Sequence, residues 1–199
     1  MKIILISGKA EAGKTTAANY IKAVLESAYD QRVAIIPYGA YVKFTAKTVW
    51  GWDGKKDEAG RKLLQWWGTD VVRARKPNFW VDRVIEIAEQ SKYYLDYLIV
   101  DDCRFPNEIE AWKDRRHLTK SPDGDLHFYP DWPEIYTLRI ERPGHENALT
   151  PEQRKHPSET ALDNYIFDMG VAAEDLQRLS FELCKTVIPK ITENLEVRE

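Results

Sequence analysis

Residues 8–15 read Gly8-Lys9-Ala10-Glu11-Ala12-Gly13-Lys14-Thr15, which matches G-x-x-x-x-G-K-[ST], the pattern of a phosphate-binding P-loop. The stretch KIILIS at residues 2–7 comes directly before it and predicts a buried strand. Apolar residues at helical spacing follow it, from Ala17 to Ala28, and predict a helix. Between such a strand and helix, backbone N–H groups of a glycine-rich turn converge on phosphate oxygens at the positive end of the helix dipole. The sequence therefore predicts a phosphate site within a strand–loop–helix unit.

The residue types in this loop indicate a nucleoside triphosphate and its magnesium ion. Lys14 is expected to reach the β- and γ-phosphates of ATP, and the Thr15 hydroxyl to bind Mg²⁺. The expected phosphate-binding set is Gly8, Ala10, Ala12, Gly13, Lys14, Thr15 and Thr16. The alternative is a glycine-rich turn that binds nothing, but a chance match in a chain of this length has a probability of only about 1%.

Composition indicates one globular domain over residues 1–199. Apolar residues make up 43% of the chain, which suits a single core with a mobile lid. The formal net charge of −3 argues against a nucleic-acid polymer as a partner. Cys103 and Cys184 lie far apart in no redox or metal-binding spacing, which predicts a reduced, cytoplasmic protein. No signal peptide and no stretch of membrane-spanning length is visible, so no membrane association is expected.

Hydrophobic periodicity along the chain predicts strands that alternate with helices. The expected strands are residues 2–7, 32–37, 95–101, 135–141 and 165–168. Helices are expected over 38–50, from Asp57 to near Gly68, after Asn78, after Asn107 with Glu110 as a capping box, after Thr150, and over 172–188. Residues 118–133 read as an irregular excursion. This alternation predicts an α/β fold, a parallel sheet of about five strands flanked by helices, with ligands beyond the carboxyl ends of the strands.

Two carboxylates and an arginine follow the third strand, where they would face the same crevice as the P-loop. In P-loop enzymes a carboxylate at this place holds the Mg²⁺ shell. The pattern does not decide between Asp101 and Asp102; we assign Asp101 to the metal with Thr15, and Asp102 to the catalytic and acceptor side. The planar fork of Arg104 suits a phosphate. Solvated turn residues are the alternative for all three.

Further arginines suggest an acceptor region over 38–92 and a lid over 142–165. The stretch from Trp66 to Trp80 is dense in aromatic and basic residues, which could stack a base and clamp a monophosphate. We expect Arg73 to bind the acceptor and Trp67 to lie in the core, whereas Trp80 suits either role. Arg142 opens the second segment, and Arg154 and Lys155 follow it. Such loop cations are typical of a closing lid, although a solvated charged loop is the alternative. No histidine or cysteine spacing predicts a metal site.

Several motifs match one family in the same order along the chain. They are Gly8 to Thr16, Trp67-Gly68-Thr69-Asp70-Val71-Val72-Arg73 with Trp80 downstream, Asp102-Cys103-Arg104-Phe105-Pro106-Asn107-Glu108, Arg142-Pro143-Gly144 and His156-Pro157-Ser158-Glu159. In these segments the chain resembles the deoxynucleoside monophosphate kinases of bacteriophages, within the wider P-loop nucleoside monophosphate kinase fold. One departure is residues 113–132, which are longer and more aromatic than the family pattern.

The resemblance implies transfer of the ATP γ-phosphoryl group to a deoxynucleoside monophosphate, with Mg²⁺, to give ADP and the diphosphate. It implies catalytic roles for Lys14, Asp102, Arg104 and Arg142, and acceptor binding by Arg73, Trp80, Asp102 and Arg104. The expected partners are therefore small nucleotides, in the host cytoplasm if the protein is phage-encoded. The preferred base, the choice between deoxyribose and ribose, and a homodimeric state stay open.

Two other functions are compatible with the P-loop. One is a kinase for a different small acceptor, against which the aromatic acceptor region argues. The other is a nucleotide-binding switch or motor ATPase. No Asn-Lys-x-Asp guanine signature is found, and no glutamate follows Asp101-Asp102 as motor ATPases usually require.

Overall fold

A five-stranded parallel sheet forms the centre of the molecule. The computed structural model describes residues 1–55, 57–114, 119–120, 126–127 and 133–197. The strands β1 (Lys2–Ser7), β2 (Val33–Ile35), β3 (Tyr97–Cys103), β6 (Glu134–Glu141) and β7 (Met169–Ala172) have the order β2-β3-β1-β6-β7, and every neighbouring pair is parallel. The predicted α/β fold with about five parallel strands is confirmed.

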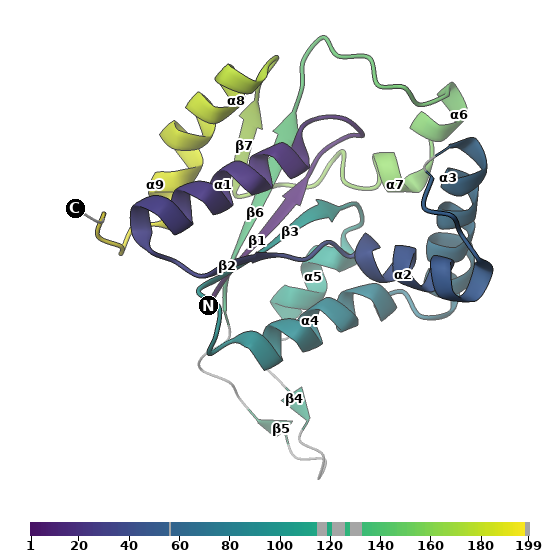
Figure 1. The fold of residues 1–199 in the computed structure, drawn as a ribbon, viewed down its shortest axis with the longest axis horizontal. Helices are drawn as coiled ribbons and strands as arrows, with labels where there is room; N and C mark the ends of the chain where they lie inside the picture. The colour runs from purple at the N-terminus through teal and green to yellow at the C-terminus, as the bar shows by residue number, and fades with distance from the viewer. Residues whose placement is uncertain (56, 115–118, 121–125, 128–132, 198–199) are drawn as a thin grey trace.

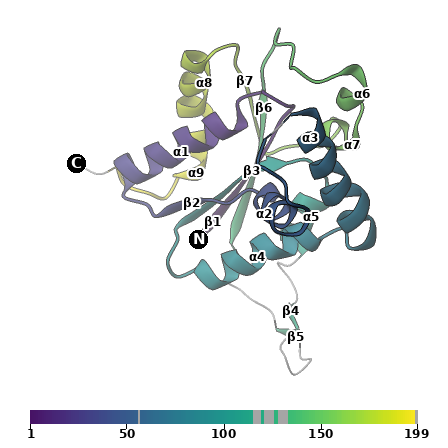
Figure 2. The ribbon, with the colours of Figure 1, turned by 45° about the vertical axis from the view of Figure 1, so that its right-hand side comes forward.

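Alternate side chains of the central strand β1 pack into two separate hydrophobic cores, one on each face of the sheet. Ile4 and Ile6 pack under α1 (Lys14–Tyr29), α8 (Leu176–Glu182), the π-helical η2 (Leu183–Val187) and α9 (Ile188–Ile191). Ile3 and Leu5 pack under α4 (Phe79–Ser91) and α5 (Asn107–Asp114). Figure 2 shows these helices on the two sides of the sheet. Because strand side chains alternate between faces, an apolar run such as KIILIS is buried on both.

Several short helices of the predicted acceptor and lid segments lie at the carboxyl edge of the sheet. Beyond the arrowheads of β1 and β3 lie α2 (Gly39–Trp50), α3 (Glu58–Gln65), α6 (Pro151–Arg154) and α7 (Pro157–Thr160) (Figure 1). The predicted caps of two of these helices are confirmed. The Asp57 carboxylate accepts the N–H of Gly60, and Thr150 forms a capping box with Gln153.

Asn78 and Asn107, which were predicted to cap helices, make other side-chain contacts in the structure. Asn78 occupies the position before α4 without a capping hydrogen bond. The Asn107 amide donates to Asn78 Oδ1 at 2.8 Å and to the Pro77 carbonyl at 3.0 Å, which joins the starts of α4 and α5. The asparagines therefore connect two helices rather than each satisfying its own.

The helix that was expected to end near Gly68 continues through it. After α3 the chain runs on as the π-helical segment η1 (Trp66–Arg73). Gly68 is buried against α2, and a Cβ there would lie 3.1 Å from Val42 Cγ1. The glycine therefore allows close helix packing instead of ending the helix, and so carries the helical chain on to Arg73.

The last strand and the closing helix both begin four residues later than predicted. The strand is Met169–Ala172 rather than 165–168, because the Asp168 carboxylate accepts the N–H and hydroxyl of Thr137 at 2.8 and 2.7 Å just before pairing begins. The helix begins at Leu176 rather than Ala172, because Asp175 caps it by accepting the N–H of Arg178.

A short pair of antiparallel strands extends away from the sheet, on the side of the molecule opposite α6 and α7 (Figure 1). It consists of β4 (Thr119–Lys120) and β5 (Leu126–His127). The rest of the predicted 118–133 excursion, apart from residue 133, lies outside the described residues. Among the helices that the structure describes, none is both long and apolar enough to cross a membrane.

Candidate active site

A cleft of about 750 Å³ opens at the carboxyl edge of the sheet. The P-loop, the start of α2, the helical stretch α3–η1, the turn after β3 and α7 contribute its walls. The predicted site residues that line it are Ala10, Lys14, Thr15, Arg73, Asp101, Asp102 and Arg104. Segments far apart in the sequence thus meet at one place, as expected where parallel strands end.

The P-loop backbone turns tightly between β1 and α1. Gly13, directly before α1, adopts φ +96°, and Glu11 adopts φ +62°. A Cβ on Gly8 would lie 2.4 Å from the Ile140 carbonyl oxygen, so only glycine fits against β6. These positions allow the loop to turn sharply at the helix N-terminus, where its N–H groups favour an anion.

Lys14 curls back over its own loop. Its ammonium donates to the Gly8 carbonyl at 2.8 Å and to the Lys9 carbonyl at 2.7 Å. Burial, together with the positive charge of Arg104, lowers the pKa of Lys14 to about 8, although the nearby carboxylates of Glu159, Asp102 and Asp101 oppose this shift. A buried ammonium that faces a second cation favours an incoming anion, because the anion would offset both the desolvation and the repulsion.

Thr15 and Asp101 form the candidate magnesium site. The Thr15 hydroxyl donates to Asp101 Oδ2 at 2.6 Å, and Asp101 is buried. The described residues contain no cluster of three histidine, cysteine or acidic side chains that could hold a metal alone. One carboxylate, one hydroxyl and the oxygens of a triphosphate are the donor set that Mg²⁺ takes in nucleotide sites, so these residues fit it.

Asp102 faces a different part of the cleft. Its two carboxylate oxygens accept the N–H groups of Tyr38 and Gly39, at 2.8 and 2.9 Å, where α2 begins. A Cβ on Gly39 would lie 2.9 Å from Asp102 Oδ2. Burial raises the pKa of Asp102, and the neighbouring Asp101 adds to this, while the two N–H donors oppose it. Of the two aspartates, Asp101 therefore contacts the Thr15 hydroxyl, and Asp102 connects β3 to α2.

Arg73 projects from the end of η1 into the cleft wall. Its guanidinium lies over the Phe105 ring, 4.5 Å from the centroid, and its Nη2 pairs with the carboxylate of Glu108. Nη1 is buried and has no hydrogen-bond partner in the part of the chain that the structure describes. Glu108 is 1% exposed and also accepts the N–H groups of Arg104 and Phe105.

Arg104 reaches across the cleft to α7. Its Nη1 pairs with the Glu159 carboxylate and donates to the Ser158 carbonyl at 3.3 Å. The other oxygen of Glu159 accepts the P-loop N–H of Ala10 at 2.9 Å. Glu108 and Glu159 were not predicted as site residues. Both close a quoted motif, but nothing in the sequence indicated that each would pair with a cleft arginine.

Six predicted site residues do not line the cleft: Gly8, Ala12, Gly13 and Thr16 in and beside the P-loop, and Trp80 and Arg142 outside it. Trp80 is fully buried under the sheet, and its indole N–H donates to the Gly68 carbonyl at 2.9 Å. Trp80 therefore belongs to the core and does not bind the acceptor in the way that the resemblance implied. Arg142 is exposed and donates through Nε to the Glu174 carbonyl at 3.1 Å. Trp67, expected in the core, packs half-buried against it and donates to Thr45 Oγ1.

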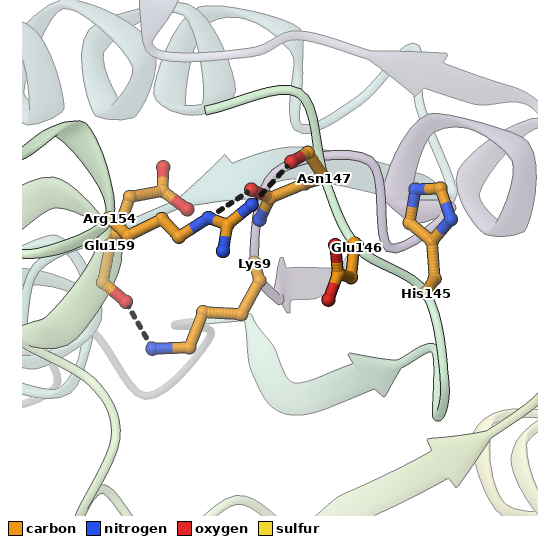
Figure 3. A pocket seen from close by; sticks show the side chains of 6 residues that line it. All are labelled: Lys9, His145, Glu146, Asn147, Arg154 and Glu159. Atoms are coloured by element: carbon orange, nitrogen blue, oxygen red, sulfur yellow. Dashed lines mark hydrogen bonds between the residues drawn. The ribbon is translucent and has the colours of Figure 1, made fainter. Parts of the chain in front are cut away.

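A smaller pocket of about 280 Å³ lies where the predicted lid meets the P-loop (Figure 3). Lys9 and Glu159 border one end, and residues 145–147 the other. Arg154 holds this segment together through hydrogen bonds to Asn147. The P-loop residue Glu11 accepts the N–H of Ala148 at 3.2 Å. Residues 145–159 thus contact the P-loop at both ends.

Comparison with solved structures agrees with the topology. The structure of TT1252 from Thermus thermophilus matches over 97% of both chains, at 15% identity and a TM-score of 0.52. This match shows a shared α/β fold around a parallel sheet. Further matches include APS kinase of Mycobacterium tuberculosis (11% identity, 92% of this chain and 94% of that one, TM-score 0.44) and thymidylate kinase of Candida albicans (12%, 100% and 95%, 0.45). No protein-family model and no curated protein matches the sequence. Identities this low show the fold and not the substrate.

Proposed function

We propose that this chain is an ATP-dependent kinase that transfers the γ-phosphoryl group to a deoxynucleoside monophosphate. The observation that carries the proposal is that two sets of phosphate-binding groups share one cleft. Lys14 and the P-loop form one set, and Arg73 with Arg104 forms the other. A nucleotide switch or motor ATPase needs the first set alone, whereas a nucleotide kinase must hold a donor and an acceptor together.

The second set is suited to a phosphate monoester. Arg73 presents a buried Nη1 that no described residue satisfies, and leaving a buried donor unpaired costs about 1–3 kcal/mol. A phosphate oxygen would satisfy it, because guanidinium and phosphate match in geometry. Glu108 holds the other side of the guanidinium, so the fork is fixed before any ligand arrives.

The wall next to these arginines is suited to a nucleobase. Val42, Leu64 and Phe105 supply apolar surface to the cleft, and Gln65 and Thr69 supply hydrogen-bonding groups. Pockets lined mainly by apolar groups, with a few polar ones, are typical of sites that bind a flat heterocycle. Because Trp80 is buried, we assign to Phe105 the stacking on the nucleobase for which Trp80 was considered from the sequence.

Catalysis in such a site depends on alignment and charge neutralisation. Thr15 and Asp101 would hold a Mg²⁺ ion, which would supply positive charge to offset the negative charge of the triphosphate. Lys14 and Arg104 would stabilise the charge that shifts toward the leaving and attacking oxygens. No strong base is required of the protein, because the acceptor phosphate oxygen is itself the nucleophile.

The proposal is tested by ADP release from ATP with and without a panel of acceptors. The panel contains the four deoxynucleoside monophosphates, the four ribonucleoside monophosphates and no acceptor, with Lys14→Ala as the control for contaminating kinases. Turnover that needs a deoxynucleoside monophosphate is the expected result. Hydrolysis independent of an acceptor would identify an NTPase, and ATP binding without turnover on any panel member would favour a kinase for another small acceptor.

A further inference from the structure

Arg73 and Arg104 in the cleft are each paired with a buried glutamate, and the pair formed by Arg104 and Glu159 joins three separate segments. The Glu159 side chain is 6% exposed. One carboxylate oxygen accepts the N–H of Ala10 in the P-loop, and the other accepts from Arg104 in the turn after β3. Glu159 itself lies in α7, so a single carboxylate connects the P-loop, the acceptor wall and the lid segment.

The contacts of Glu159 restrict the side chain of Arg104. Arg104 is 34% exposed, and a long side chain at such a place loses rotamer freedom when it is fixed. In the described part of the chain its hydrogen bonds to Glu159 and to the Ser158 carbonyl both use Nη1. The rest of the planar fork lines the cleft and is available for phosphate oxygens.

The same contacts attach α7 to the donor site. Besides the Ala10 N–H, the Lys9 ammonium donates to the Glu159 carbonyl oxygen at 2.5 Å (Figure 3). Asp163, four residues further along, pairs with Lys9 and lies 3.5 Å from Arg139, but it does not contact Arg104. Glu159 and Asp163 therefore both attach α7 and the residues after it to the P-loop, and of these two only Glu159 also contacts Arg104.

We propose that Glu159 is a positioning residue that fixes the Arg104 guanidinium between the donor and acceptor phosphates. It rests on the proposed function, because that function assigns phosphates to both sides of Arg104. Glu159 does not touch the reacting atoms. It acts through Arg104, and it makes the placement of that arginine dependent on α7 being docked on the P-loop.

A double-mutant cycle tests this assignment. The variants are Glu159→Ala, Arg104→Ala and the double variant, with Glu159→Gln as a conservative change and Asp163→Asn as a matched control on the same segment. If Glu159 acts through Arg104, Glu159→Ala should lower kcat/KM for the acceptor about 10- to 150-fold, the range for a lost charged hydrogen bond. Removing Glu159 from Arg104→Ala should then cost less than about two-fold more. The KM for ATP should stay within about two-fold throughout.

The control separates positioning from tethering. Asp163→Asn loosens the same segment from Lys9 without touching Arg104, so its kcat/KM should remain within about three-fold of the wild type. Glu159→Gln keeps an oxygen for Ala10 but loses the charge that holds Arg104, and it should behave like Glu159→Ala. Additive losses in the double variant, or equal losses in Asp163→Asn, would overturn the proposal and leave Glu159 a structural residue.

Binding measurements distinguish this proposal from the proposed function. Calorimetric titration with inorganic tripolyphosphate and with each deoxynucleoside monophosphate requires no turnover. Weaker monophosphate binding by Glu159→Gln, with unchanged tripolyphosphate binding, supports positioning. Tighter tripolyphosphate binding would instead mean that Glu159 occupies a phosphate position and must be displaced, which overturns it. If the wild type binds monophosphates but shows no acceptor-dependent turnover, the proposed function fails and the titrations still decide the role of Glu159.

Discussion

The hydroxyl of Thr15 and the carboxylate of Asp101, 86 residues apart in the sequence, are joined by a 2.6 Å hydrogen bond at the floor of the cleft. The bond brings the last residue of the P-loop motif to the end of the neighbouring strand, β3. It also separates the roles of two adjacent aspartates, since Asp102 points to the start of α2. The alternation of strand side chains makes this separation necessary, because neighbouring residues of a strand face opposite sides.

Asp101→Asn should therefore impair the use of magnesium, and Asp102→Asn should not. The amide in Asp101→Asn carries no charge for the metal, so we expect the Mg²⁺ concentration for half-maximal activity to rise about ten-fold or more. In Asp102→Asn the amide nitrogen cannot accept a hydrogen bond, so either the Tyr38 or the Gly39 N–H loses its partner. Thermal stability should therefore fall, with an unchanged Mg²⁺ dependence. Magnesium titrations of activity and thermal melts of both variants check this. A reversed pattern would exchange the two assignments.

Lys14→Ala should abolish turnover and retain the fold. The Lys14 ammonium is the cation next to the expected β- and γ-phosphates, and loss of a major electrostatic group costs on the order of 10³-fold in kcat. Stability should not fall, because burial and Arg104 both disfavour the charged lysine in the folded protein. Circular dichroism melts and single-turnover kinetics measure the two effects. Near-normal turnover by the folded variant would contradict the kinase mechanism.

The lowered pKa of Lys14 predicts a pH dependence of ATP binding. In the free protein this pKa is about 8, so above pH 8 the lysine loses its proton. Bound phosphate stabilises the charged form, so binding above pH 8 must take up a proton, and affinity should fall by up to about ten-fold per pH unit. Titration calorimetry at pH 7 and 9, in two buffers of different ionisation enthalpy, measures the proton uptake. Lys14→Met supplies the control, which should show none from this group.

Local signals in the sequence were sufficient for the sheet, whose predicted parallel strands are confirmed. The P-loop motif and the carboxylates Asp101 and Asp102 at the end of β3 also depend on residues close together in the chain, and the structure brings them to one cleft, while their roles stay predictions. Glu108 and Glu159 could not be predicted, since each pairs with an arginine 35 or 55 residues away, and spacing along the chain does not reveal such pairs. Gly68 shows the same limit, because the reason for a glycine there is the approach of Val42 from another helix.

Arg73→Ala should weaken acceptor binding, but only a compensated variant will show this cleanly. The loss of one charged hydrogen bond corresponds to about 10- to 150-fold in acceptor KM. Arg73→Ala alone also leaves the buried Glu108 carboxylate unpaired, which is destabilising by about 3–5 kcal/mol. Burial already raises the pKa of Glu108 and the Arg73 charge opposes this, so the carboxylate would tend to become protonated without Arg73.

The double variant Arg73→Ala/Glu108→Gln removes both charges together and is the appropriate test protein. Its ATP affinity should equal that of the wild type, while its acceptor KM should show the full increase. Glu108→Gln alone serves as the matched control. Equal weakening of ATP and acceptor would place Arg73 on the donor side, and no change in either would return it to a structural role.

Closure of residues 142–159 should accompany the binding of both nucleotides. Most residues of the segment are exposed, and its contacts with the P-loop are a few hydrogen bonds, from Glu11 to His145 and Ala148 and from Lys9 and Ala10 to Glu159. A segment with so few buried contacts should exchange its amide hydrogens readily without ligand. Phosphates on both sides of Arg104 would add charged hydrogen bonds across the cleft and exclude water from the transferring group. Hydrogen exchange with and without a bisubstrate analogue measures this.

Arg142 and Arg154 provide a matched pair within that segment. The structure places Arg154 at the pocket between lid and P-loop, and Arg142 outside, bonded to the Glu174 carbonyl. If closure brings Arg142 inward, as its place after β6 suggests, Arg142→Ala should lower kcat more than it raises either KM, because the contact forms only near the transition state. Arg154→Ala should instead lower the protection of residues 145–148, since it removes the hydrogen bonds to Asn147. Unchanged exchange of residues 142–159 on adding both nucleotides would refute the lid, and unchanged kinetics in Arg142→Ala would leave that arginine a surface residue.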